Sequence, residues 1–256
     1  MPRYFIEVFY RGTNFSGFQV QKNAVTIQSE AESALFTLFR QQFHLTGSSR
    51  TDAGVHAFQN YFHFDSGDKL FHSEETGNGE KSVEEILYSL NSILPADIVI
   101  KRIFEVPDQA HCRFDAISRH YKYYLYNKKN PFLKDTAYYY PYILAFEQLR
   151  QAAFIVLDTK DFAAFSKRNT QVVNFKCTLQ KSEWIQENDL LVYSVVANRF
   201  LRGMVKGLVG TMLKVGTGKL SMDGFKKVIE SRDCKNADFS PSSNGLFLVE
   251  VKFDYF

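Results

Sequence analysis

Patterns of hydrophobic and polar residues predict an alternation of strands and helices in the first half of the chain. Large apolar residues alternate along 3–10, as in a strand, whereas apolar positions from Ile27 to Phe39 recur at helical spacing. The other elements predicted here are strands at 43–46 and 58–65, a helix capped by Ser82 and ended by Pro95, and a strand at 98–104. This β-α-β-β-α-β order predicts a ferredoxin-like half.

A similar pattern restarts after a break near Pro107 and Asp108. The elements predicted there are a strand around 121–126, a helix at 146–157, strands at 175–185 and 190–197, helices at 200–215 and 221–231, and a strand at 246–253. We therefore predict an α+β protein with two domains, residues 1–107 and 108–256, related by a weak structural duplication.

Composition narrows the class of protein. Hydrophobic residues make up 45% of the 256 positions, enough to form real cores. The three cysteines (Cys112, Cys177 and Cys234) lie far apart, which argues against a zinc site or a disulfide framework and fits a reducing cytoplasm. Nothing at the N-terminus resembles a signal peptide, and no apolar run approaches the roughly 18 residues of a membrane span. With a net charge of only +3, nucleic-acid binding would require positive charge gathered on one surface.

The stretch from Gly47 to Ala57, centred on Asp52, is the candidate for chemistry. It connects two predicted strands, and a carboxylate on such a connection can be held rigidly while staying open to a substrate. Arg50 lies two residues earlier, where its charge would favour the ionised carboxylate and lower the pKa of Asp52. On the residues alone Asp-Ala-Gly favours an ordinary turn, because Asp bonds local backbone and Gly accepts positive φ.

The motif Arg50-Thr51-Asp52-Ala53-Gly54-Val55-His56-Ala57 resembles the active-site motif of the tRNA pseudouridine synthase A family. Further segments similar to the family follow in the same order: Tyr10–Gln21, Arg119–Tyr123, Asp161–Phe165, Phe200–Lys206 and Gly245–Leu248. The resemblance runs from about Tyr4 to about Phe253, nearly the whole chain. It implies two ferredoxin-like or RRM-like halves whose antiparallel sheets join across a central active-site cleft, with helices on the outer faces.

The resemblance also implies an activity and a set of partners. The reaction converts uridine to pseudouridine in the anticodon stem-loop of tRNA, with no cofactor, no metal and no membrane association. The expected assembly is a cytoplasmic homodimer that grips one tRNA. A carboxylate could attack C1′, stabilise positive charge there, or remove a 2′ proton, and the sequence does not choose among these routes.

The expected site residues are those at positions that match the functional residues of the family. Asp52 is the expected nucleophile, Tyr121 the expected stacking partner of a flipped uracil, and Arg50 and Lys206 the charge-positioning cations. Arg202 shares a predicted helical arc with Arg199 and Lys206 and is an expected RNA contact. His56 belongs to the motif, either to pack the loop or to contact substrate and transfer protons.

Several features leave alternatives open. Arg11, Ser49 and Lys206 stand where the family commonly carries Asp, Gly and Arg, which keeps a different RNA target open. Tyr121 is alternatively a core aromatic, and the nearby Gly203, Gly207 and Gly210 indicate either tight helix-on-sheet packing or RNA contact. Residues 66–82, without clear periodicity, form either an exposed loop or a flap that orders on RNA. Four cations either contact RNA phosphates or are simply solvated loop charges: Lys128, Lys129, Lys167 and Arg168. Rival functions are a non-catalytic RNA-binding module and a nucleosidase that releases free uracil.

Overall fold

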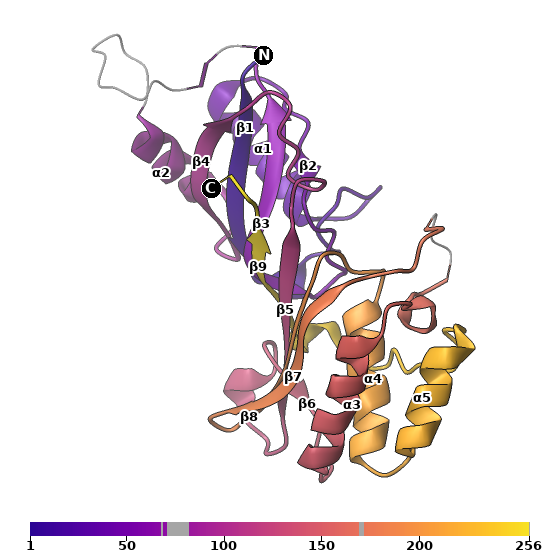
Figure 1. Ribbon diagram of the computed structural model, residues 1–256. Coiled ribbons are helices and arrows are strands. Elements are labelled where there is room, and N and C mark those ends of the chain that lie inside the picture. The colour runs from indigo at the N-terminus through magenta and orange to yellow at the C-terminus, as the bar shows by residue number, and fades with distance from the viewer. Residues whose placement is uncertain (68, 71–81, 169–171, 256) are drawn as a thin grey trace. The chain divides into compact units, whose positions relative to one another are not determined.

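The computed structural model describes residues 1–67, 69–70, 82–168 and 172–255 (Figure 1). It is a mixed α+β protein, as predicted, with a sheet whose strand pairs are mostly antiparallel. The chain divides into two compact units, residues 1–117 with 250–256, and residues 118–249. This division differs from the predicted break at 107/108 in falling ten residues later and in returning the C-terminal segment to the first unit.

The first unit has the predicted element order. Its elements are β1 (Arg3–Tyr10), α1 (Ile27–Phe39), β2 (Thr46–Gly47), β3 (His56–Asp65), α2 (Val83–Ile93) and β4 (Ile98–Val106). Within this unit β1 lies between β4 and β3, and β2 pairs with β3. The strand expected at 43–46 is reduced to Thr46–Gly47. Phe43 and Leu45 are nevertheless buried, so these apolar side chains pack in the core although their backbone is not part of a strand.

Side-chain caps explain where the first-unit helices begin. Thr26 and Ser29 form a reciprocal capping box at the start of α1. Ser82, the predicted cap of α2, accepts a hydrogen bond from the Glu85 N–H, and the Glu85 carboxylate accepts one from the Ser82 N–H. These caps satisfy backbone donors that have no partner within the helix. The region 66–82 lies largely outside the described residues, so the loop and flap alternatives for it stay predictions.

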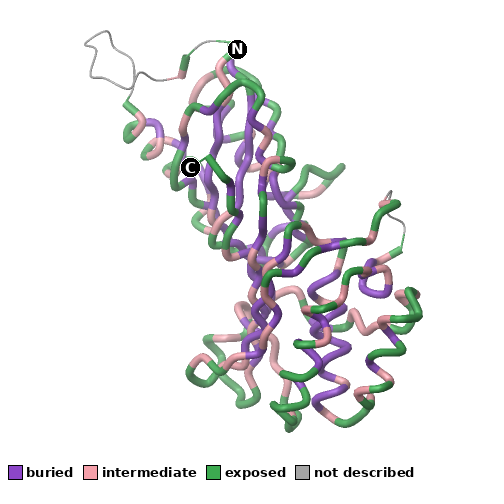
Figure 2. The backbone as a smooth tube through the Cα atoms, viewed as in Figure 1, coloured by how far each residue is buried: buried purple, intermediate pink, exposed green. Residues whose placement is uncertain are grey.

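Aromatic and aliphatic side chains fill the first-unit core on the face of β1 and β3 that holds Tyr4, Ile6, Phe62 and Phe64. Figure 2 shows these strands as mostly buried backbone. Phe18 stacks on Phe62 with ring centroids 4.4 Å apart. Core packing therefore ties the segment before α1 to the strand that follows the Asp52 loop.

His63 on the other face of β3 makes the first unit sensitive to acid. Its Nδ1 lies 3.1 Å from the Cys112 thiol, and burial is the main cause that lowers its pKa to about 4. The unfolded chain binds the extra proton near pH 6.5, so the free energy of unfolding should fall as the pH drops from about 6.5 towards 4. Urea unfolding at several pH values should show a weaker acid dependence in His63→Gln. An unchanged dependence would contradict this assignment.

The second unit contains the remaining elements. They are β5 (Ser118–Tyr126), β6 (Tyr138–Tyr139), α3 (Phe146–Asp158), β7 (Leu179–Glu187), β8 (Leu190–Ala197), α4 (Met204–Gly216), α5 (Met222–Ser231) and β9 (Leu246–Lys252), whose residues from Glu250 onward belong to the first unit. β8 lies between β5 and β7, and α3 packs on β7 and against α4 and α5 (Figure 1). The two-residue β6 was not predicted, and β7 begins four residues later than expected.

Helix α4 begins at Met204, so the predicted start at Phe200 is wrong. Gly203 precedes it with φ of 73°, a left-handed conformation that ends helical propagation on the N-terminal side. Arg199 and Arg202 therefore lie in the segment before the helix. The shared helical arc proposed for these two residues and Lys206 does not exist, although all three belong to one stretch of the second unit.

The glycines of α4 mark close packing, but against a loop rather than a sheet. A Cβ on Gly207 would lie 2.7 Å from the Phe239 ring, and one on Gly210 would lie 2.2 Å from the Asp238 carbonyl oxygen. The expected close approach of another backbone is therefore confirmed at Gly210. Its partner is the segment 238–241 that leads to β9.

Gly210→Ala should destabilise the second unit, because the new methyl group collides with backbone that cannot rotate away. We expect a loss of about 1–3 kcal/mol in the free energy of unfolding, measured by urea denaturation. Gly67→Ala is the control, since nothing lies within 4 Å of its added Cβ. Equal stability of the two variants would contradict the packing argument.

Candidate active site

Asp52 lies in a tight turn between β2 and β3. The Val55 N–H donates to the Asp52 carbonyl at 3.2 Å, and Gly54 has φ of 78°. That positive φ is what a turn of this kind requires of its third residue, which explains the glycine in the motif. Asp-Ala-Gly can therefore be both an ordinary turn and part of a catalytic site, because the turn itself presents the carboxylate.

The segment between β1 and α1 supports this turn from behind. Phe18 N–H donates to the Thr51 carbonyl at 3.1 Å. Gly17 has φ of 104°, and a Cβ there would lie 3.1 Å from the same Thr51 oxygen. At Gly12, a Cβ would lie 2.0 Å from the Val55 carbonyl oxygen. Only glycine allows the two backbones to approach this closely, so the family-like segment Tyr10–Gln21 and the Asp52 motif form one packed structure.

A buried hydrogen-bond network anchors the turn to β3. Asn60 is fully buried, and its amide exchanges two hydrogen bonds with the backbone of Ser49, at 2.8 and 3.2 Å. The same amide donates to the Tyr10 hydroxyl at 3.1 Å, and that hydroxyl lies 2.8 Å from the Thr51 hydroxyl. The network ends on the residue next to Asp52. It was not predicted, and its sequence signal is a single Asn in a strand that also contains His, Gln and Asp residues.

The charged groups of the motif point outward from this rigid base. Asp52 and Arg50 are exposed, whereas Thr51 between them is buried. Among the described residues of the first unit, the Asp52 carboxylate takes part in no hydrogen bond or ion pair, so the expected partnership with Arg50 is not formed there. An exposed carboxylate on an anchored turn is available to a substrate.

His56 is part of the support rather than of the exposed surface. Its side chain is 1% exposed, and its Nδ1 accepts a hydrogen bond from the Gly12 N–H at 3.1 Å. An accepting Nδ1 means that the proton of the neutral ring is on Nε2. These contacts favour loop packing over proton transfer, the two alternatives that the sequence left open.

The other predicted site residues belong to the second unit. Tyr121 on β5 is 8% exposed, and its ring meets Phe200 edge to face with centroids 4.8 Å apart. Lys206 on α4 is half-buried and donates to the Ser243 hydroxyl at 3.3 Å. Arg202 is exposed, and its carbonyl accepts the Lys167 N–H at 2.9 Å. Tyr121 and Lys206 are therefore both partly engaged by neighbours within their unit.

Two departures from the family pattern have local structural explanations. Arg11 pairs with Asp97 at 3.1 Å, so its charge is directed to the β4 side of its unit. Ser49 uses its backbone for the Asn60 network, and its side chain is buried. Neither replacement disturbs the turn around Asp52.

No helix within the described ranges is long and apolar enough to cross a membrane. Nor do the described residues hold three or more His, Cys, Asp or Glu side chains arranged to bind a metal ion.

Comparison with known proteins points to one family. A sequence profile described as tRNA pseudouridine synthase matches residues 8–115 and 152–254. The chain is 43% identical to the tRNA pseudouridine synthase A of Parabacteroides distasonis, over 99% of this chain and 96% of that protein. Identity is 40% to the protein of that name from Bacteroides fragilis, covering 99% and 97% of the two chains. It is 33% to the one from Staphylococcus aureus strain MW2, covering 98% and 91%. With matches that span nearly its whole length, this chain belongs to the tRNA pseudouridine synthase family.

Proposed function

We propose that this chain isomerises uridine to pseudouridine in tRNA, with Asp52 as the group that acts at the sugar. The observation that carries the proposal is the geometry of Asp52, an exposed carboxylate with no hydrogen-bond or ion-pair partner among the described residues of its unit, on a turn that buried contacts hold in place. A preorganised anion suits a reaction that develops positive charge at C1′. Family membership supplies the substrate class.

The reaction balances without any co-reactant. In the nucleophilic route a carboxylate oxygen of Asp52 bonds to C1′ as the N1–C1′ bond breaks, and the electron pair leaves with uracil. The base turns, C5 bonds to C1′, and the carboxylate is released. The C5 proton is then lost to solvent, and N1 regains a proton. In the alternative route Asp52 removes a 2′ proton to assist departure of the base. It returns that proton to the 2′ position as C5 bonds to C1′, and the same C5 proton is lost at the end.

Other residues take supporting roles in this proposal. Tyr121 stacks on the flipped uracil, Arg50 and Lys206 position charge, Arg202 contacts the RNA, and His56 holds the Asp52 turn. We further propose ferredoxin-like, RRM-like halves that meet at a central cleft, a homodimer that binds one tRNA, and a target in the anticodon stem-loop. The antiparallel strands of each unit and the family membership support this arrangement.

The direct test is release of tritium from tRNA labelled at C5 of uridine. Turnover should release tritium into water and leave pseudouridine in the tRNA, because every route ends with loss of the C5 proton. Free uracil in place of pseudouridine would indicate a nucleosidase, and binding without release would indicate a non-catalytic RNA-binding module. Mapping the modified positions would then test the anticodon stem-loop as the target.

A further inference from the structure

Three segments that are distant in sequence meet at one end of the second unit. They are residues 159–168, 199–203 and 230–236. The Lys167 N–H donates to the Arg202 carbonyl at 2.9 Å, which joins the first segment to the second. Ion pairs from Arg232 to Asp161 at 3.2 Å and from Arg168 to Asp233 at 3.1 Å join the first segment to the third. We call the cations of these segments the basic rim.

The basic rim concentrates the positive charge of the chain. The three segments contain seven Lys or Arg residues (Lys160, Lys167, Arg168, Arg199, Arg202, Arg232 and Lys235) and three acidic residues (Asp161, Glu230 and Asp233). They therefore carry a formal excess of four positive charges, whereas the whole chain carries three. All other residues together are slightly acidic. This is the gathering of charge that nucleic-acid binding by a nearly neutral chain requires.

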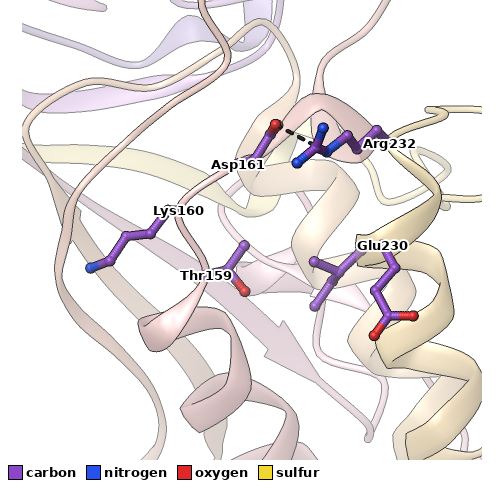
Figure 3. Close-up of a pocket in the computed structure, with 6 residues that line it drawn as sticks. Thr159, Lys160, Asp161, Glu230 and Arg232 are labelled. Carbon is purple, nitrogen blue, oxygen red and sulfur yellow. Dashed lines mark ion pairs between the residues drawn. The ribbon is translucent and has the colours of Figure 1, made fainter.

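Two of the rim cations lie at a hollow of about 410 Å³, which is lined by Thr159, Lys160, Asp161, Ile229, Glu230 and Arg232. Figure 3 shows Lys160 and Arg232 on opposite sides of the hollow, with Thr159 between them and Glu230 directed away from the Asp161–Arg232 pair. The lining is mixed polar and apolar, and the side chains of its cations are exposed. A site of this kind suits a flexible polyanion that passes over it better than an apolar ligand that must be enclosed.

The two ion pairs orient the rim without neutralising it. Each pair leaves the arginine side chain well exposed, 70% for Arg232 and 60% for Arg168. A guanidinium has five N–H donors, so one carboxylate contact leaves donors for phosphate oxygens. The pairs also link the first segment to the third.

We propose that the basic rim binds the sugar-phosphate backbone of tRNA. It would contribute affinity and orientation rather than chemistry, as phosphate contacts do in other nucleic-acid complexes. The inference rests on the proposed function for the identity of the RNA. Its physical basis, the charge and the geometry of the rim, is independent of Asp52.

The test compares two pairs of Lys→Gln substitutions within the second unit. Lys160→Gln/Lys235→Gln removes two exposed rim cations. Lys219→Gln/Lys226→Gln removes two exposed lysines from other parts of the unit, one before α5 and one in its middle. With an unmodified tRNA transcript, the rim variant should bind roughly tenfold more weakly. The slope of log affinity against log salt should fall by about 1.4–1.8, since each of the two lost phosphate contacts removes roughly 0.7–0.9. Turnover at saturating tRNA should stay within twofold.

The control variant should bind tRNA like the unaltered chain, and Lys160→Arg/Lys235→Arg should keep both the affinity and the salt slope. Equal weakening by both Gln pairs, or none by either, would overturn the proposal. So would poly-glutamate that competes as well as tRNA at equal charge, since that result indicates an acidic polypeptide as the ligand. If the unaltered chain forms no pseudouridine, the proposed reaction fails, while the binding comparison still decides the role of the rim.

Discussion

Replacing Asp52 with asparagine is expected to abolish pseudouridine formation while leaving tRNA affinity within a few-fold. Asn has nearly the shape of Asp but cannot attack C1′ or accept a proton, so every route through the carboxylate is lost. A fall in turnover of at least about a thousandfold corresponds to about 4 kcal/mol of transition-state stabilisation. The Asp52 side chain makes no hydrogen bond or ion pair with the described residues of the first unit, so the substitution should not alter stability. Tritium release under single-turnover conditions measures the effect.

Asp108→Asn is the matched control for Asp52→Asn. It removes one exposed carboxylate from the same unit, and Asp108 takes part in no described hydrogen bond or ion pair. Turnover and unfolding should both match the unaltered chain. Retained turnover in Asp52→Asn would reject the role assigned to this carboxylate. A loss of tRNA binding in that variant would instead assign Asp52 to recognition.

Sequence patterns predicted most helices and strands, because apolar spacing and capping residues determine these elements locally. Apolar spacing identifies α1 from Ile27 to Phe39, and the capping residue Ser82 identifies the start of α2. The start of α4 was misjudged because apolar and basic residues continue the helical rhythm upstream of Met204. The left-handed conformation of Gly203, beside the Lys167 side chain, is a tertiary effect that periodicity does not record.

The sequence predicts the part of the candidate site that lies within one motif. It does not predict the parts that depend on contacts between residues distant in sequence. The Asp52 turn, its Gly54 and its exposure follow from eight consecutive residues. The Asn60–Tyr10–Thr51 network joins residues up to fifty positions apart and appears only when β1 pairs with β3. The Arg11–Asp97 pair is equally non-local. The basic rim combines three segments, none of which is strongly basic on its own.

Asn60→Leu should both destabilise the first unit and slow the reaction, because it removes the anchor of the Asp52 turn. Leu fits the volume approximately but leaves the Ser49 N–H and carbonyl and the Tyr10 hydroxyl without the amide. Each buried polar group that loses its partner costs about 1–3 kcal/mol. We expect at least about 3 kcal/mol less free energy of unfolding by urea denaturation. We also expect a fall of roughly a hundredfold in turnover, since small misplacements of a reacting group are costly.

Asn91→Leu separates the effect on the turn from a general loss of stability. Asn91 on α2 likewise exchanges two hydrogen bonds with a distant backbone, that of Ile100 on β4, at 2.8 and 2.9 Å. Its removal should lower the free energy of unfolding but leave turnover unchanged at a temperature where both variants are folded. If Asn60→Leu kept full turnover under those conditions, the network would be a feature of the fold alone. If both variants lost turnover equally, stability would explain the loss. Only a selective defect at Asn60 shows that the reaction depends on how firmly the first unit holds its carboxylate.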